Sequence, residues 1–185
     1  TPHYKRQAWA ICLGLWLAGL NLAWGSEIWV KIDTREQTLD VMRGDKLQQR
    51  FDTVALGRGG VGKDRRKGDG KTPLGEFHIT RINHSSPFLL FFGLNFPLPE
   101  HAERAFKAGK IDQTSYQKIL TAHLQGEIPP QDTPLGGQIG IHGLGGASLK
   151  VHKRYNWTKG CVALTNPQIR ALSRSIGVGT RVVIQ

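Results

Sequence analysis

Alternation of apolar and polar residues in short segments is the feature that most restricts how this chain of 185 residues can fold. Residues 27–33 and 37–42 alternate in this way around the polar turn 34–36, which is the pattern of a β-hairpin. A second turn at 43–46 leads into another strand-like segment, 47–56. Further strands are predicted at 75–82, 138–142, 161–164 and 180–184. The sequence therefore predicts a mainly β fold.

Helices are expected to be few and short. Residues 99–108 and 112–124 have helix-like composition, and the prolines around them indicate that 99–125 is a helical insertion between strands. A better-defined helix is predicted over 168–175, with Asn166 as its N-cap. No internal repeat is visible, so one domain with an insertion accounts for the pattern.

The N-terminal segment has the composition of an export signal. Lys5 and Arg6 precede the apolar stretch 8–24, which ends in small residues that fit a cleavage site. We predict a cleaved signal peptide over 1–25, with an uncleaved N-terminal membrane anchor as the alternative. Residues 26–185 would then form one domain outside the cytoplasm, long enough for a single hydrophobic core.

The chain is strongly basic, with a formal net charge of +11 at pH 7 and an isoelectric point near 10.1. Outside the cytoplasm such a charge suits anionic surfaces such as cell wall, lipopolysaccharide or phospholipid. Export and the lack of any nucleic-acid-binding motif argue against nucleic acid as the partner. Composition decides nothing finer than this.

Two further patterns suggest sites that their context excludes. Residues 57–62 match the glycine spacing of a dinucleotide-binding loop, but no helix former follows, and Asp64 stands where a P-loop needs serine or threonine. We therefore interpret this segment as a flexible basic loop beside a cleft. His142 and His152 are ten residues apart and lack the close ligand spacing of a zinc peptidase. No metal and no cofactor is expected.

Cys161 is the only cysteine in residues 26–185, so an intramolecular disulfide in that segment is excluded. An inert buried thiol, an intermolecular crosslink and a nucleophile remain open. His142, nineteen residues upstream, could accept the thiol proton. Gly160 would let the backbone turn so that N–H groups face a developing oxyanion, and Gly143 would permit close approach of substrate or backbone. On the residues alone, catalysis competes evenly with a buried strand cysteine and a core histidine.

Several segments together carry a family resemblance. Residues 141–143 read Ile-His-Gly, and 158–162 read Thr-Lys-Gly-Cys-Val. Residues 68–77 read Gly-Asp-Gly-Lys-Thr-Pro-Leu-Gly-Glu-Phe, and 178–184 form an apolar closing strand. In this order, over 28–184, they resemble the YkuD-type L,D-transpeptidases. The resemblance implies a mainly β domain, either a sandwich or a mixed sheet, with a few short helices.

The resemblance also implies an activity. Cys161 would be the nucleophile and His142 the base, with a backbone carbonyl near Gly143 orienting the imidazole. The donor would be a peptidoglycan tetrapeptide stem, attacked at the carbonyl between diaminopimelate and D-alanine, and a thioester would form. An amine of a second stem or of an envelope protein would resolve it, whereas water would make the enzyme a carboxypeptidase or hydrolase. A monomer in the bacterial periplasm or cell envelope is expected.

Four residues around the thiol are expected to contact substrate: Trp157, Thr158, Lys159 and Lys71. Many family members carry histidine where this chain has Lys159, and arginine or asparagine where it has Ala163. The sequence around the cysteine is similar to a branch that includes YafK-like proteins. Lys159 could help to hold a thiolate or attract a stem carboxylate.

Other exported cysteine enzymes fit less well. A sortase has a longer separation of histidine and cysteine and an arginine on a following strand, whereas Arg170 and Arg174 fall on a predicted helix. A papain-like endopeptidase places its histidine after the cysteine, and none follows Cys161. A non-catalytic wall-binding module remains as an alternative.

Overall fold

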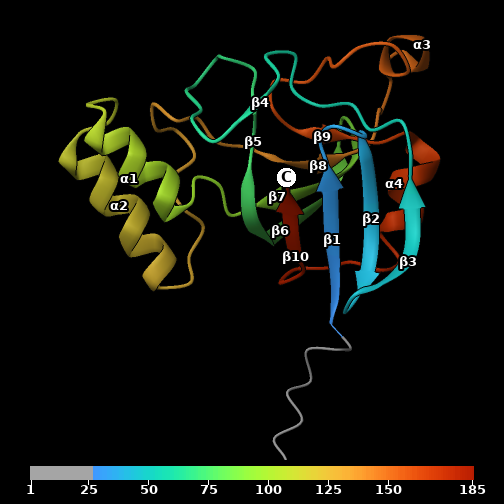
Figure 1. Ribbon diagram of the computed structural model, residues 1–185, viewed down its shortest axis with the longest axis horizontal. Helices are drawn as coiled ribbons and strands as arrows, with labels where there is room; N and C mark the ends of the chain where they lie inside the picture. The colour runs from blue at the N-terminus through green and yellow to red at the C-terminus, as the bar shows by residue number, and fades with distance from the viewer. Residues whose placement is uncertain (1–26) are drawn as a thin grey trace, which may run out of the picture.

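The computed structural model describes residues 27–185 (Figure 1). The predicted signal peptide or anchor, residues 1–25, lies outside the described residues. Within the described part of the chain, no helix has both the length and the apolar character needed to cross a membrane. The predicted mainly β fold with few short helices is confirmed.

One half of the main sheet contains both ends of the described chain. β1 (Ile28–Asp33), β2 (Thr38–Arg43) and β3 (Lys46–Phe51) form an antiparallel meander, and β10 (Arg181–Ile184) pairs in parallel with β1. Trp29 lies opposite Arg181 in this pairing, and the Arg181 guanidinium lies 4.4 Å from the centroid of its ring system. The closing strand is therefore central, between β1 and β6.

The other half of the sheet carries the candidate chemistry. The long strand β6 (Gly75–Ser86) pairs with β10 on one side and with β7 (Leu89–Leu94) on the other. β8 (Gly140–His142) and β9 (Val162–Ala163) then complete the order β3-β2-β1-β10-β6-β7-β8-β9. A separate two-stranded sheet is formed by β4 (Val61–Gly62) and β5 (Thr72–Pro73).

A single hydrophobic core joins the two halves because the buried strand positions carry mainly apolar side chains. Its members include the fully buried Val30, Ile32, Phe77, Ile141 and Leu164. Burial of apolar area contributes roughly 25 cal/mol per Å² removed from water, which makes this core the main source of stability.

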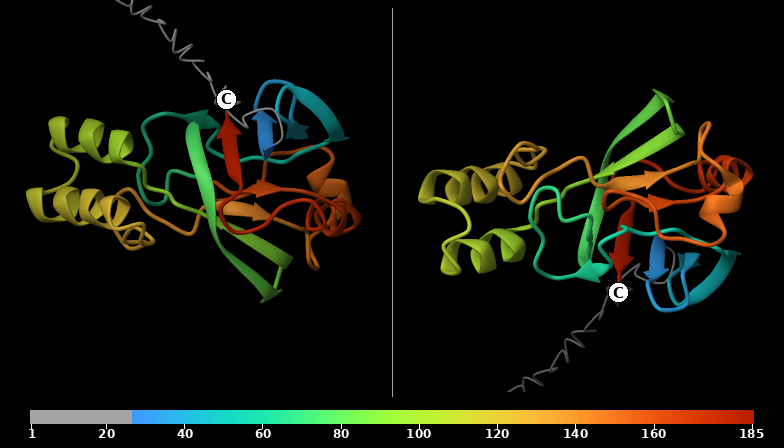
Figure 2. Two further views of the ribbon diagram at one scale, coloured as in Figure 1. Left: turned by 90° about the horizontal axis from the view of Figure 1, so that it is seen from below. Right: turned by 90° about the horizontal axis from the view of Figure 1, so that it is seen from above.

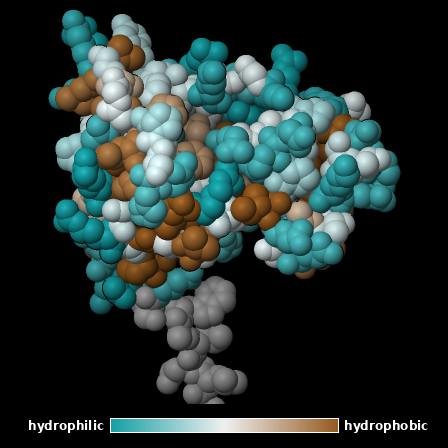
Figure 3. All heavy atoms as spheres, turned by 180° about the vertical axis from the view of Figure 1, so that it is seen from behind, coloured by the Kyte–Doolittle hydropathy of each residue, from teal (hydrophilic) through white to brown (hydrophobic). Residues whose placement is uncertain are grey.

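The helical insertion forms a pair at one end of the molecule (Figures 1 and 2). α1 (Pro99–Lys107) begins at a proline, and α2 (Gln113–Leu124) begins after Asp112, whose carboxylate accepts from the Ser115 N–H at 2.7 Å. Seen from behind, the pair is a lobe with a mainly hydrophilic surface, and the larger hydrophobic areas lie on the body of the domain (Figure 3).

The predicted cap of the last helix is wrong by one residue. α4 spans Asn166–Leu172, and its N-cap is Thr165, which forms a capping box with Gln168. The Asn166 side chain instead accepts from the Leu144 and Gly145 N–H groups, both at 2.9 Å. Asn166 therefore fixes the loop that follows His142, a tertiary role that the local sequence cannot show.

Four elements were not predicted, namely the two-residue strands β4 and β5, the strand β7 and the short helix α3, and one predicted strand was too long. β7 lies in an uninterrupted apolar run, in which no alternation distinguishes a strand from a buried helix. α3 (Leu149–His152) is a single turn. The strand predicted over 47–56 ends at Phe51, because the chain then leaves the sheet edge and Ala55 makes an isolated bridge to Ala163.

Three buried imidazoles predict a loss of stability in acid. Burial lowers the pKa of His101, His142 and His152, so the unfolded chain binds more protons than the folded one below the unfolded value of about 6.5. Stability is therefore expected to fall as the pH drops from about 7.5 to about 5, by at most about 1.4 kcal/mol per pH unit for each imidazole. Urea unfolding at a series of pH values measures this slope.

Two variants test whether the buried His101 contributes to this dependence of stability on pH. His101 accepts from the Leu98 N–H through Nδ1 and donates to the Leu74 carbonyl through Nε2. His101→Gln should reduce the acid sensitivity, whereas His78→Gln, at an exposed position, should leave it unchanged. Equal slopes in all three proteins would contradict the assignment.

Candidate active site

Strand pairing brings the cysteine and the histidine to one face of the sheet. β8 and β9 run parallel, with Ile141 opposite Val162 and His142 opposite Ala163. One step back in the same register, Gly140 lies beside Cys161. Residues paired in parallel strands point to the same face, and every second residue of a strand shares that face. The thiol and the imidazole therefore project from neighbouring strands toward the same side, although nineteen residues separate them.

His142 is buried and held in one orientation. Its Nδ1 lies 2.6 Å from the Gly143 carbonyl oxygen, which can only accept, so Nδ1 carries the proton and Nε2 keeps its lone pair. The Phe88 ring stacks on the imidazole with centroids 4.3 Å apart, and Trp157 meets it edge-on at 5.9 Å. Burial lowers the pKa of His142, and the bond to Gly143 opposes that shift. A neutral imidazole with a free Nε2 is suited to accept a proton.

A tight turn delivers Cys161 to the start of β9. The buried Thr158 hydroxyl donates to the Cys161 carbonyl at 2.7 Å and accepts from the Gly160 N–H at 3.1 Å. Gly160 has φ +130°, and a Cβ there would lie 2.6 Å from the Lys71 carbonyl oxygen. Only glycine fits this turn. The Gly160 N–H is used within the turn, so we assign Gly160 to the backbone geometry rather than to an oxyanion.

A buried arginine ties this turn to the rest of the domain. The Arg65 guanidinium donates to the carbonyl oxygens of Lys71 at 2.9 Å, Leu135 at 2.9 Å and Lys159 at 3.0 Å. Three loops distant in sequence are thereby joined around one side chain. The charged residues around Arg65 show no local pattern that distinguishes it from its neighbours, so the sequence did not predict this role.

The surroundings of the thiol keep it protonated at neutral pH. Cys161 is half-buried, and its Sγ donates to the Gln138 carbonyl oxygen at 3.2 Å. Burial raises the pKa of the thiol to about 11, and the Gly140 N–H and the guanidiniums of Arg65 and Arg81 act in the opposite direction. Thiol and imidazole are therefore both neutral at pH 7, and a nucleophile forms only by transfer of the thiol proton.

This state predicts a steep pH dependence of thiol reactivity. Because the thiolate is the reactive form and becomes more abundant as pH rises, alkylation of Cys161 by iodoacetamide should accelerate about tenfold per unit between about pH 7 and about pH 9. Peptide mapping of the alkylated protein isolates the Cys161 signal. A plateau reached below about pH 8 would contradict the assignment, because it would indicate a preformed thiolate–imidazolium pair.

The residues predicted to contact substrate lie around this turn in different environments. Trp157 is half-buried, and its Nε1 donates to Nδ1 of the buried His152 at 3.3 Å. Lys159 is exposed and Lys71 half-buried, and the backbone carbonyls of both are held by Arg65. The Thr158 hydroxyl serves the turn. Contact of these four with a substrate stays a prediction.

The excluded motifs have structural explanations. The glycine-rich segment that begins at Gly57 leads into β4 rather than into a helix. A Cβ at Gly57 would lie 2.1 Å from the Gly70 carbonyl oxygen, so the glycines there permit two backbone segments to run in contact. Within residues 27–185, no three histidine, cysteine, aspartate or glutamate side chains gather as a metal site.

Comparison with known proteins gives a family and a fold. A model of the L,D-transpeptidase catalytic domain, YkuD, matches residues 27–184. No curated protein sequence is similar enough to count as a match. Bd1075 of Bdellovibrio bacteriovorus is similar in structure, with TM-score 0.55, 18% identity, and coverage of 86% of this chain and 48% of that one.

Two further solved structures are similar. The helical cell shape determining protein Pgp2 of Campylobacter jejuni has TM-score 0.55 and 21% identity, and the alignment covers 86% of this chain and 47% of that one. An L,D-transpeptidase of Mycobacterium smegmatis has TM-score 0.48 and 14% identity, and the alignment covers 87% of this chain and 59% of that one. The chain thus spans about half the length of these proteins. By the match of the family model over most of its length, the chain belongs to the YkuD family of L,D-transpeptidase catalytic domains.

Proposed function

We propose that this domain is a cell-wall L,D-transpeptidase in which Cys161 attacks a peptidoglycan tetrapeptide stem at the carbonyl between diaminopimelate and D-alanine. The observation that carries the proposal is the placement of Cys161 and His142 on one face of neighbouring strands, with the imidazole oriented by the Gly143 carbonyl. Membership of the family supports a cysteine-dependent reaction on peptidoglycan.

Acylation would use one proton transfer in each direction. Nε2 of His142 takes the thiol proton as Sγ of Cys161 bonds to the carbonyl carbon, and a tetrahedral oxyanion forms. The carbon–nitrogen bond then breaks, and the imidazolium returns the proton to the departing amine of D-alanine. The products are a thioester on Cys161, free D-alanine and a neutral imidazole, so atoms and charges balance.

Deacylation would depend on the acceptor. An amine of a second stem would give a crosslink, an amine of an envelope protein would give attachment, and water would give a shortened tripeptide stem. In each case neutral His142 accepts the proton of the incoming nucleophile. The exposed Lys159 beside the thiol is proposed to attract stem carboxylates, in place of the histidine that many relatives carry.

The place of action proposed is the bacterial periplasm or cell envelope. The net charge of +11 favours the anionic wall polymers. The structurally similar Pgp2 is described as a determinant of helical cell shape, and we propose a related part in cell shape and wall organisation for this chain. The domain is proposed to act as a monomer without a cofactor.

Incubation with purified disaccharide-tetrapeptides, followed by chromatography and mass spectrometry, tests the proposal. Release of D-alanine, with a thioester mass on the wild-type protein, is expected. Crosslinked dimers, conjugates with an added protein amine, and tripeptides distinguish the three acceptors. A carbapenem, whose strained ring acylates thiols, provides a second covalent probe of Cys161. No D-alanine release and no adduct from either probe would contradict the proposed activity and favour the wall-binding module.

A further inference from the structure

A row of residues runs across four strands from Arg81 to the thiol. Arg81 on β6 lies opposite Gly93 on β7, and Gly93 lies opposite Gly140 on β8. The parallel register of β8 with β9 continues this row to Cys161. The two central positions are glycines, so the row has no side chains of its own between the arginine and the cysteine.

The Arg81 side chain lies along this row and toward the thiol. A Cβ at Gly93 would be 2.8 Å from Cγ of Arg81 and 2.9 Å from its Cζ, so the guanidinium lies above β7. Nη2 donates to Oε1 of Gln138 at 2.6 Å, and the backbone carbonyl of that same residue accepts from Sγ of Cys161. The guanidinium also lies 5.5 Å from the centroid of the Phe91 ring. Gln138 and Phe91 thus hold the cation on the cysteine side of its strand.

Most of the binding capacity of this guanidinium is unused. An arginine has five N–H donors, and within residues 27–185 the Arg81 side chain uses one of them, on Gln138. No carboxylate of the described residues forms an ion pair with it. Arg65, the other arginine near Cys161, instead donates to three carbonyl oxygens. Of these two arginines, Arg81 is the one placed to take an anion.

Resting on the proposed function, we infer that Arg81 binds the C-terminal carboxylate of the donor stem, the carboxylate carried by the residue that leaves. The guanidinium above β7 is two strand spacings, about 10 Å, from the strand of Cys161. The bound substrate would span a similar length in three parts. These are about 3 Å from the sulfur to the attacked carbon, about 3.8 Å for one residue, and about 2.8 Å for a charged hydrogen bond between the carboxylate and the guanidinium. Arg81 would thus select stems that end one residue beyond the attacked carbonyl.

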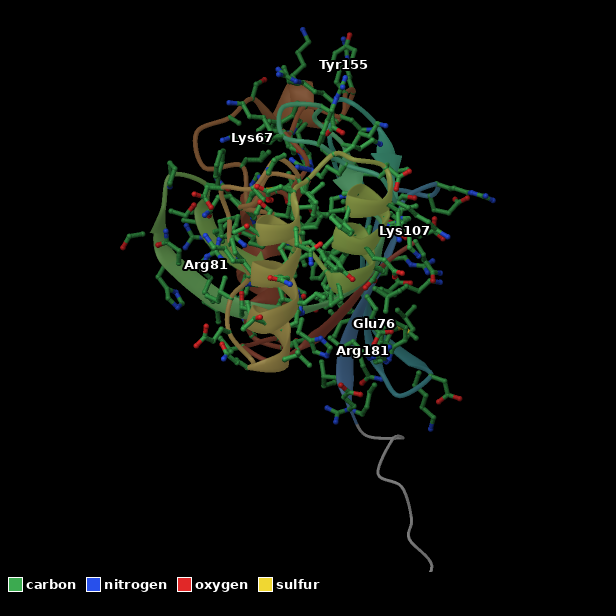
Figure 4. All side chains as sticks on the ribbon, turned by 90° about the vertical axis from the view of Figure 1, so that its left-hand side faces the viewer. Lys67, Glu76, Arg81, Lys107, Tyr155 and Arg181 are labelled. Carbon is green, nitrogen blue, oxygen red and sulfur yellow. The ribbon has the colours of Figure 1, made fainter. Side chains whose placement is uncertain are left out.

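This assignment accounts for a departure in the sequence. Ala163, two residues after the cysteine, offers no cation where many relatives carry arginine or asparagine. Ala163 lies opposite His142, in the row next to that of Cys161, and the cation of this chain comes instead from β6, which lies three strands from β9 in the sheet. Figure 4 shows Arg81 on β6, well apart from the paired Glu76 and Arg181.

Two donors and two variants test the inference. Wild type should process a tetrapeptide stem with a free C-terminal carboxylate about 10- to 100-fold better in kcat/KM than the same stem with a C-terminal amide, because a charged hydrogen bond is lost. Arg81→Met should bring the ratio close to one. Gly93→Ala, whose Cβ displaces the arginine without changing it, should lower the ratio in the same way. A third donor, amidated on the diaminopimelate carboxylate, shows whether that group is bound instead.

Controls separate this inference from the proposed activity. Arg181→Met removes a half-buried arginine that also packs on an aromatic ring, and it should leave the ratio unchanged. Binding of the acid and amide stems to Cys161→Ala protein gives the same comparison without turnover. Equal binding of both stems, or a preference that survives Arg81→Met, overturns the role of Arg81. If the acid stem binds better than the amide stem through Arg81 but is not turned over, the role of Arg81 is upheld and only the proposed reaction is overturned.

Discussion

Replacement of Cys161 by alanine is expected to abolish release of D-alanine from tetrapeptide stems, a loss of about 10⁴-fold or more, because it removes the proposed nucleophile on which the acyl intermediate forms. The fold should be retained. The thiol is half-buried and makes one side-chain hydrogen bond within the described residues, to the Gln138 carbonyl. Single-turnover mass spectrometry and a urea unfolding curve measure the two quantities on the same samples.

His142 provides the matched test of mechanism. His142→Gln should be nearly as inactive as Cys161→Ala, because it removes the group that accepts the thiol proton. A double variant should then be no worse than either single one, since the two side chains act as a unit. Substantial turnover by Cys161→Ala would contradict the nucleophile assignment. Turnover by His142→Gln, with Cys161 still required, would contradict only the base.

Replacement of Arg65 by leucine is expected to lower both stability and activity. Three carbonyl oxygens, one buried and two partly buried, would lose their donor, which should cost about 3 kcal/mol of unfolding free energy. The turn that delivers Cys161 would also lose its tie to the neighbouring loops, and displacement of a nucleophile by about 1 Å costs about 100-fold in rate. Urea unfolding and kcat/KM, measured where the variant is still folded, test both effects.

The adjacent residue offers a control for this prediction. Arg66 is exposed, so Arg66→Leu should change neither quantity appreciably. Arg65→Lys keeps the charge but lacks the planar fork that reaches three carbonyls, and it should recover only part of the loss. Full activity in Arg65→Leu at unchanged stability would show that the three loops hold together without the guanidinium.

Local patterns predicted most of the secondary structure. The hairpin of β1 and β2, the long strand β6 and the helical insertion follow from alternation and capping residues that act within a few positions. β7 was not predicted because an unbroken apolar run is compatible with either a strand or a buried helix. Its pairing between β6 and β8 in the sheet makes it a strand. The α4 cap was misassigned because Asn166 makes its contacts with a loop that precedes it by more than twenty residues.

The sequence by itself determined the chemical types of the site: one cysteine, one upstream histidine, and glycines beside each, in an order that resembles a known family. The tertiary structure decided what surrounds them. Gln138 contacts the thiol, Arg81 contacts Gln138, and Arg65 holds the turn that carries Cys161; all three come from other loops and strands, which the order and register of the sheet bring together. Local sequence encodes turns and alternation through short-range sterics, whereas cross-strand neighbours depend on how the whole core packs, which no single segment contains.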